Sequence, residues 1–251
     1  MNKIAIMCCG VAAGLSATAA QAQDTAAEQT GPYGALHIGV AIQSDTDLDY
    51  SDEGGTFGGT GAIDTIKTSV DSKSALDFGG TLGYDFGIIR SDIEVDYSRS
   101  KIRALTLKSV NGTAVATIDP ADANDFCDYA ELDTCSVSGN RISINGGRLR
   151  QLSALANVWV DLPVGGAITP YVGGGLGIGG FEIEGEGKAK FAWQLGAGVA
   201  FDISPAIALT ADYRYRQFSS SNFTDDDFPE YALRVGKIKT SRISAGIRFK
   251  F

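Results

Sequence analysis

The residues Ile243–Phe251 read ISAGIRFKF, and their side chains alternate strictly between two kinds. One face of this stretch would carry Ile243, Ala245, Ile247, Phe249 and Phe251, and the other Ser244, Gly246, Arg248 and Lys250. Such period-two alternation predicts a β-strand with two unlike faces. In a soluble sheet, an unpaired strand of this kind would offer a sticky edge to other chains. The rest of the sequence therefore has to supply its neighbours.

Seven further segments show the same alternation, and no helical period follows the N-terminal region. These segments are residues 33–43, 76–86, 89–97, 151–162, 169–179, 191–202 and 209–216, and the final strand begins near Lys239. In residues 89–97, for example, Ile93 and Val95 alternate with Asp92 and Glu94. The sequence therefore predicts eight strands.

The connections between these strands alternate between long and short. Long connections are expected at residues 44–74, 99–148, 180–190 and 217–238, and short ones near residues 87–88, 163–168 and 202–206. All long connections then lie at one end and both chain termini at the other, as in transmembrane barrels with periplasmic turns and extracellular loops. We therefore expect an all-β fold, an eight-stranded antiparallel up-and-down transmembrane β-barrel.

The polarity of the two faces favours a membrane barrel over a soluble sandwich. Aromatic residues stand at strand ends, where barrels place them at the membrane–water boundary. We expect the opposite, polar face to line the lumen with Asp77, Asp85, Arg90, Asp92, Glu94, Asp96, Asp161, Asp212, Arg214, Arg216, Arg242 and Arg248. These charges form either an ion-conducting pore or an interior filled by ion pairs. Because eight strands leave room for little beyond side chains, we favour the packed interior.

The N-terminus has the features of a secretory signal peptide. Lys3 precedes an apolar run, and Ala20-Gln21-Ala22 is a cleavage pattern of the A-x-A type. We expect a signal peptide at residues 1–22, a short N-terminal segment at 23–31 and the barrel at 32–251. Cleavage would leave 20 basic and 30 acidic residues, a net charge of −10. An acidic chain repels nucleic acid and has no overall attraction to anionic headgroups.

Two cysteines, Cys127 and Cys135, remain after cleavage, and in an oxidising compartment we expect them to form a disulfide. A metal site would need further Cys or His nearby, and the chain has a single histidine, His37, which strand parity directs into the lumen. A Ser–His hydrolase is disfavoured because Gly-x-Ser-x-Gly is also absent. We expect no catalytic residue, cofactor or resident metal, although the acidic runs at 45–49 and 225–227 leave open divalent bridges to lipopolysaccharide.

Several segments together resemble the small eight-stranded outer-membrane barrels of Gram-negative bacteria. They are NVWVDLP (157–163), ITPYVGGGLGIG (168–179), FAWQLGAGVAFDIS (191–204), ADYRYR (211–216) and AGIRFKF (245–251). The resemblance is to the transmembrane domain of outer-membrane protein A and to alphaproteobacterial opacity and surface-antigen barrels. It implies a surface-exposed integral barrel whose last strand is recognised by the barrel-assembly machinery, with Ile247, Phe249 and Phe251 as the assembly signal.

The function that we expect is structural and surface-related, with envelope integrity or adhesion carried by the extracellular loops of a monomer in the outer membrane. Its partners would be outer-membrane lipids and lipopolysaccharide, and the assembly machinery during biogenesis. Two alternatives remain, a narrow-pore porin or small-solute transporter and, less favoured, a lipid-modifying enzyme.

Overall fold

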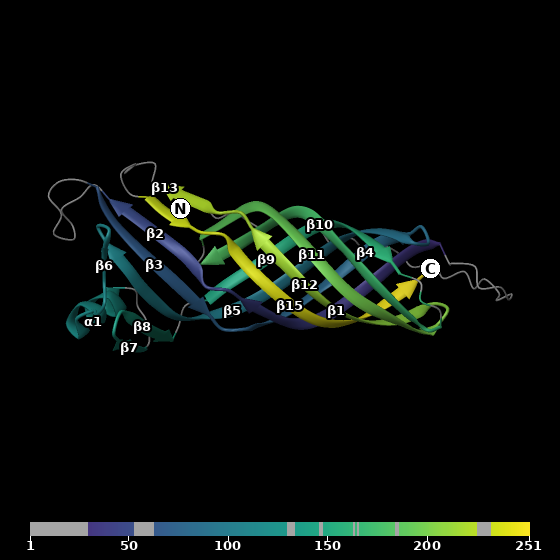
Figure 1. Cartoon of the computed structure of the whole chain (residues 1–251), viewed down its shortest axis with the longest axis horizontal. Helices are drawn as coiled ribbons and strands as arrows, with labels where there is room; N and C mark the ends of the chain where they lie inside the picture. The colour runs from purple at the N-terminus through teal and green to yellow at the C-terminus, as the bar shows by residue number, and fades with distance from the viewer. Residues whose placement is uncertain are drawn as a thin grey trace.

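The computed structural model describes residues 30–52, 63–129, 134–145, 148–162, 164, 166–183, 186–224 and 232–251. The expected signal peptide at 1–22 and most of the segment at 23–31 lie outside the described residues, as do parts of the four expected loops. In the described part, antiparallel strands predominate and form the elongated molecule of Figure 1.

Eight strands close into a barrel. In spatial order they are β1 (Gly31–Gln43), β4 (Ala75–Asp85), β5 (Ile89–Val110), β9 (Arg148–Asp161), β10 (Ile168–Ile183), β11 (Glu186–Ser204), β12 (Ile207–Phe218) and β15 (Ile238–Lys250). Each pairs antiparallel with the next, and β15 closes the ring against β1. The predicted eight-stranded antiparallel barrel is confirmed, and the strand containing Ile243–Phe249 has β1 and β12 as its neighbours.

The outward-facing side chains of these eight strands, called here the outer wall, are largely apolar. Leu36 is 65% exposed and Leu82 is 72% exposed, whereas the charged residues of the opposite face are buried. In β5, buried and more exposed residues alternate without interruption from Ile89 to Lys101. This distribution is the reverse of that in soluble proteins, where buried positions are mostly apolar and charged residues face water. It is the pattern expected of a wall that faces lipid.

The two ends of the barrel differ. At the terminal end, where β1 begins and β15 finishes, the strands are joined by tight turns (Figure 1). The Phe86 amide donates to the Ile89 carbonyl over 2.9 Å, and Gly87 between them has a φ of 102°, a conformation that favours glycine. The opposite end, called here the extended end, carries additional strands and the one described helix.

Four short strands lengthen the barrel wall at the extended end. They are β2 (Thr46–Asp52), β3 (Asp64–Ser72), β13 (Ser221–Thr224) and β14 (Ala232–Val235), and with β5 they form a sheet in the order β13–β14–β2–β3–β5. Parts of the segments expected as loops at 44–74 and 217–238 are therefore paired strands. Likewise, β10 and β11 stay paired as far as Ile183 and Glu186, so most of the loop expected at 180–190 is strand. Wall segments beyond the lipid need no apolar face, so strict alternation does not mark them.

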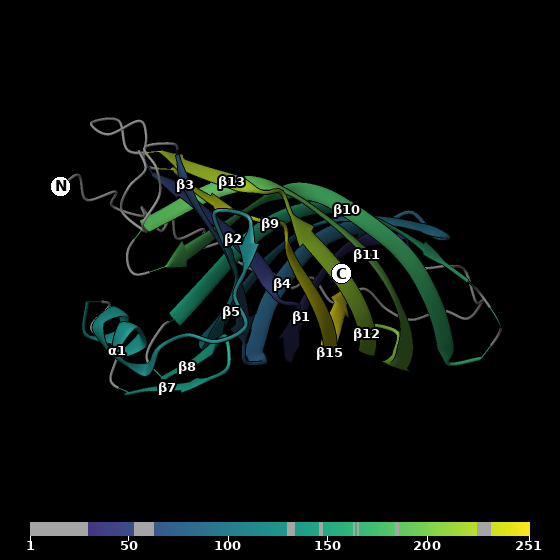
Figure 2. The ribbon, with the colours of Figure 1, turned by 60° about the vertical axis from the view of Figure 1, so that its left-hand side comes forward.

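The expectation of no helix is wrong for one segment. The helix α1 (Pro120–Tyr129) lies within the connection expected at 99–148, together with β6 (Thr113–Ala114), β7 (Thr134–Ser138) and β8 (Arg141–Asn145). Asp119 caps the helix, since its Oδ1 accepts a hydrogen bond of 2.8 Å from the Ala121 amide, and Pro120 suits the first helical position. Figure 2 shows α1, β7 and β8 beside the extended end, and we call α1 and β6–β8 the satellite.

Within the described residues, no helix is both long enough and apolar enough to cross a membrane.

Candidate functional site in the lumen

The charged residues expected in the lumen come together inside the barrel. Among them Asp161 is partly buried, with 13% of its side chain exposed, and the others are buried. They come from β4, β5, β9, β12 and β15, so the network is assembled across strands far apart in the sequence.

The centre of this network is Glu94 on β5, which is fully buried. Its Oε1 accepts hydrogen bonds of 3.0 Å from Arg216 and from Arg242, and its Oε2 forms an ion pair with Arg214. Arg216 also pairs with Asp96. Charged hydrogen bonds in a water-poor interior are strong, and removal of one partner leaves the others uncompensated. We call Asp77, Glu94, Asp96, Arg214, Arg216, Arg242 and His37 the central cluster.

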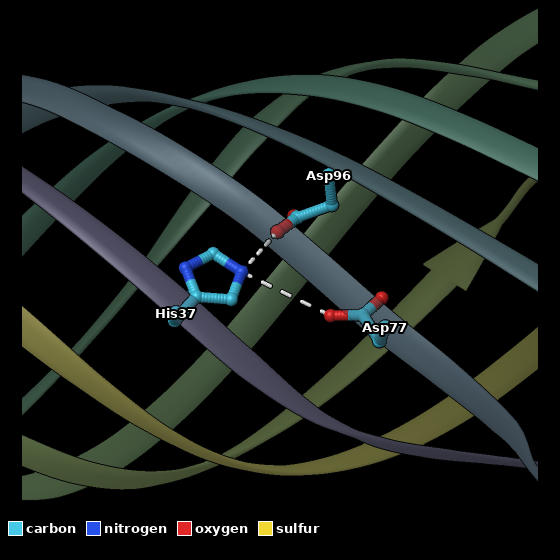
Figure 3. Close-up of side chains that lie close together, drawn as sticks. All are labelled: His37, Asp77 and Asp96. Atoms are coloured by element: carbon cyan, nitrogen blue, oxygen red, sulfur yellow. Dashed lines mark hydrogen bonds and ion pairs between the residues drawn. The ribbon is translucent and has the colours of Figure 1, made fainter.

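His37 on β1 belongs to this cluster, and Figure 3 shows it converging with Asp77 and Asp96. Its Nε2 lies 2.6 Å from Asp96 Oδ1 and 3.9 Å from Asp77 Oδ1. Arg242 Nη1 lies 3.0 Å from the same nitrogen, so Nε2 donates to Asp96 in one tautomer and accepts from Arg242 in the other. One imidazole and two carboxylates at this spacing are a conceivable metal site. However, Arg242 Nη1 lies 2.9 Å from Asp77 and 2.5 Å from Asp96, so a guanidinium already supplies the cation there.

A second layer of polar contacts lies toward the terminal end. Arg90 makes a bidentate pair with Asp161, with two contacts of 2.7 Å. Asp92 accepts hydrogen bonds from the Tyr33 hydroxyl at 2.6 Å and from Trp159 Nε1 at 2.9 Å. Aromatic side chains therefore fill this part of the lumen and also satisfy a buried carboxylate.

Several residues of this layer and the adjoining network were missed by the sequence reasoning, which selected charged side chains. Tyr33, Asn157, Trp159, Tyr171 and Gln194 are all buried in the lumen. Strand parity could have placed them in the lumen, since Asn157, Trp159 and Gln194 lie on the polar face of their strands. The same holds for Tyr33, which shares its parity with His37, and for Tyr171, which lies opposite Val172 and Leu176.

An apolar cluster lies in the lumen, mostly toward the extended end. It consists of Leu149, Leu155, Ala192, Phe218, Val235 and Ile238. We call it the apolar cap. Leu48 and Phe223, from the additional strands, pack against it. The cap is therefore shared between the barrel and its extension.

Two small cavities lie in the lumen among the described residues. One, of about 20 Å³, is lined by Tyr33, Trp159 and Arg248, among others, and the second, of about 10 Å³, by Asp77, Gln151 and Arg216, among others. Each is comparable to the space needed by about one water molecule. A hydrated ion is larger than either cavity.

Glycines make room for the large lumen side chains. A Cβ at Gly173 would lie 2.7 Å from a ring carbon of Trp159, and one at Gly198 would lie 2.5 Å from Cζ of Tyr171. Both distances are below ordinary carbon–carbon contact. The Gly-rich segment of β10 and β11 is thus explained by close approach inside the barrel.

The remaining residues singled out from the sequence lie outside the lumen. Cys127 in α1 and Cys135 in β7 form the expected disulfide, with a Cα–Cα distance of 6.3 Å. Ile247, Phe249 and Phe251 lie on the outer wall at the terminal end and are 41%, 38% and 65% exposed. Their recognition by an assembly machinery stays a prediction.

Comparisons of the sequence with known proteins agree with this architecture. The family model described as surface antigen matches residues 44–245. An uncharacterized protein of Brucella abortus is 28% identical over 174 residues, which cover 60% of this chain and 54% of that protein. Major surface antigen 4 of Anaplasma marginale is 24% identical over 149 residues, which cover 59% of this chain and 49% of the antigen. The chain thus spans about half the length of the curated relatives it matches.

Among solved structures, the outer membrane protein OprG from Pseudomonas aeruginosa is similar to this chain with a TM-score of 0.53 and 12% identity. The alignment covers 88% of this chain and 98% of OprG. At this identity the similarity concerns the fold, a barrel of the outer membrane.

Proposed function

Since the chain belongs to the surface antigen family and is an integral barrel of the Gram-negative outer membrane, we propose that it is a non-enzymatic surface protein. Its lumen serves as a polar structural core, and its extended end reaches out of the cell and carries envelope and adhesion-like interactions. Its partners are outer-membrane lipids and lipopolysaccharide, with the barrel-assembly machinery during biogenesis, and it acts as a monomer.

The observation that carries this proposal is the filled lumen. The central cluster occupies the middle of the barrel, the buried apolar cap packs on its extended side, and the cavities of about 20 and 10 Å³ do not accommodate a hydrated ion. A packed interior supports the barrel without offering a path across the membrane. The surface from which the protein can contact other molecules is then the extended end.

A narrow pore or small-solute transporter is the second candidate, favoured by the charges of both signs in the lumen. A pore would require the central cluster to open, which would separate Arg242 from Asp77, Glu94 and Asp96 in a water-poor interior. A lipid-modifying enzyme has less support, because His37 is held inside the lumen by Asp96 and does not face the outer wall.

The orientation can be tested by labelling single cysteines on intact cells. Lys67→Cys places a thiol on the exposed surface of β3 at the extended end, and Val164→Cys places one in the terminal-end turn, where the side chain is 66% exposed. A membrane-impermeant maleimide should label the first on intact cells and the second only after lysis. The reverse pattern would show that the extended end faces the periplasm.

The interaction role can be tested with a trimmed variant. Thr106 and Arg141 are register partners, so residues 109–138 can be replaced by an Asn-Gly turn that joins β5 directly to β8. We expect the trimmed protein to restore detergent resistance to a deletion strain but not its adherence to surfaces, whereas the full chain restores both. If deletion of the protein changes neither property, the proposed function is wrong.

A further inference from the structure

A row of cationic side chains stands on the outer wall where β5 and β9 leave the apolar belt. Arg99 and Arg150 are register partners on these two strands, and both are exposed. Lys101, two residues further along β5, is also exposed, and its register partner is Arg148. Like charges directly opposite each other in a sheet destabilise it. A local excess of positive charge at this position therefore requires compensation.

Only part of that compensation comes from the residues that the structure describes. Arg103, next along the same face of β5, has Asp71 at 3.8 Å. For Arg99 and Lys101, by contrast, the described residues supply no ion-pair partner. Another cation, Lys73, is exposed nearby, and its amide donates to the Lys101 carbonyl over 2.8 Å.

The row lies at a defined height on the barrel. One step toward the terminal end from Arg99 and Arg150, the register pair is Tyr97 and Leu152, and the Tyr97 ring packs at 5.4 Å from that of Phe78. Aromatic side chains of this kind mark the boundary of the lipid-facing belt. A two-residue step along a strand is about 6.7 Å, so the cations begin at the level of lipid headgroups.

The opposite boundary of the membrane lacks such a row. In the described part of the outer wall, no lysine or arginine stands near the terminal end, since Lys250 has the lumen-facing parity of Arg248 and is paired with Asp202 at 3.0 Å. Among the described residues, the positive charge of Arg99 and Lys101, which lacks an ion-pair partner there, thus lies at one boundary, although the whole chain is acidic.

We propose that Arg99 and Lys101, flanked by Arg150 and Lys73, form a binding site for the phosphate groups of lipopolysaccharide in the outer leaflet. The guanidinium of Arg99 offers planar donors for phosphate oxygens, and Lys101 adds a second charge from the same face of β5. The acyl chains of the lipid would lie along the apolar wall beside Leu76 and Leu152, which are 66% and 49% exposed. This inference rests on the proposed orientation, because the site has to face the leaflet that contains this lipid.

The test uses the full chain, folded in zwitterionic detergent micelles, so that its outcome does not depend on orientation in a cell. Binding of phosphorylated lipid A is compared with binding of the same lipid after removal of its phosphates. The variant pair is Arg99→Gln with Lys101→Gln, and the matched control is Lys67→Gln with Lys108→Gln, two cations further out on the extended end. At roughly fivefold in affinity for each cation, we expect about twenty-fivefold weaker binding for the first variant. The control should change affinity less than about twofold.

Further experiments distinguish a loss of charge from a loss of folding, and binding of the lipid from binding of any free anion. The charge-conserving variant Arg99→Lys with Lys101→Arg should bind as the unchanged protein does, and heat-dependent migration on SDS gels verifies that every variant is folded. Equal affinity for the dephosphorylated lipid, or unchanged binding by the Gln variant, would overturn the proposal. So would displacement of the lipid by inorganic phosphate at equal concentration, which would indicate a general anion site. None of these outcomes would affect the labelling test of orientation.

Discussion

At the scale of single residues, Arg242 has the most demanding position in the lumen. It is 3% exposed and donates to Asp77, Glu94 and Asp96 from one guanidinium. Replacement by Met would leave three buried carboxylates without this cation, and the loss of one partner from a buried pair costs about 3–5 kcal/mol. We expect Arg242→Met to lower the free energy of unfolding in lipid vesicles by that amount, measured by urea titration of tryptophan fluorescence.

Two further variants serve as comparisons for the effect of Arg242→Met on stability. Lys250→Gln removes a partly exposed ion pair with Asp202 and should cost less than about 1 kcal/mol. Adding Asp96→Asn to Arg242→Met should recover part of the loss, because it removes one of the uncompensated charges. A loss below about 1 kcal/mol for Arg242→Met itself would mean that the central cluster is hydrated and open.

Glycine positions give a second test at this scale. A Cβ at Gly198 would meet Tyr171 Cζ at 2.5 Å and Asp212 Cβ at 2.7 Å, whereas at Gly80, on the outer wall, the nearest atom would be 3.4 Å away. Overpacking a filled interior costs about 1–3 kcal/mol. We expect Gly198→Ala to destabilise the barrel by about that amount and Gly80→Ala to leave the urea midpoint nearly unchanged. If the two substitutions changed the urea midpoint equally, the lumen would accommodate an added methyl group as readily as the lipid-facing wall does.

At the scale of elements, the satellite is a small structure joined to a larger one. The Cys127–Cys135 disulfide connects α1 to β7, and Ala123 and Ile142 pack around it, while β8 is paired with β5 over only three residues. Closing a short loop stabilises it by about 2–3 kcal/mol. Reduction should therefore speed hydrogen exchange in α1 without changing the SDS resistance of the unheated barrel. Loss of that resistance on reduction would show that the satellite supports the barrel itself.

The strands of the barrel could be predicted from the sequence, whereas the elements beyond it could not. The barrel strands were predictable because lipid on one side and a polar lumen on the other impose strict alternation, as from Ile89 to Tyr97. Beyond the belt this constraint ends. In β2, with the sequence TDLDYSD, only Leu48 and Tyr50 alternate with polar residues, and this pattern is too short to mark a strand. The helix α1 is only 10 residues long, although Asp119-Pro120 was a usable signal for its start.

The lumen was predictable in composition and not in detail. Parity alone assigned charged residues such as Glu94 and Arg242 to the interior. Which acid meets which arginine depends on the register of β5 relative to strands more than a hundred residues away, and that register is not encoded locally. Tyr33 and Tyr171 also have lumen parity and were missed because only charged side chains were selected as lumen residues.

At the scale of the whole molecule, the outer wall should behave as a lipid-facing surface. Ile38, in the middle of β1, is 60% exposed, and Ile63, at the start of β3 on the extended end, is 66% exposed. A charge near the bilayer midplane costs about 2–4 kcal/mol, and one outside the bilayer costs almost nothing. We expect Ile38→Arg to lower the free energy of unfolding in vesicles by that amount and Ile63→Arg to leave it unchanged. If neither substitution changed the free energy of unfolding, β1 would not face lipid.

The closed lumen is the central claim, and ion conductance in planar bilayers tests it most directly. The protein is inserted at neutral pH, and its insertion is verified by recovering the SDS-resistant folded form from the same membranes. With the central cluster intact and the apolar cap in place, we predict no stable current steps above those of the protein-free bilayer. Reproducible single-channel steps from the unchanged protein would contradict the account and establish the lumen as a pore.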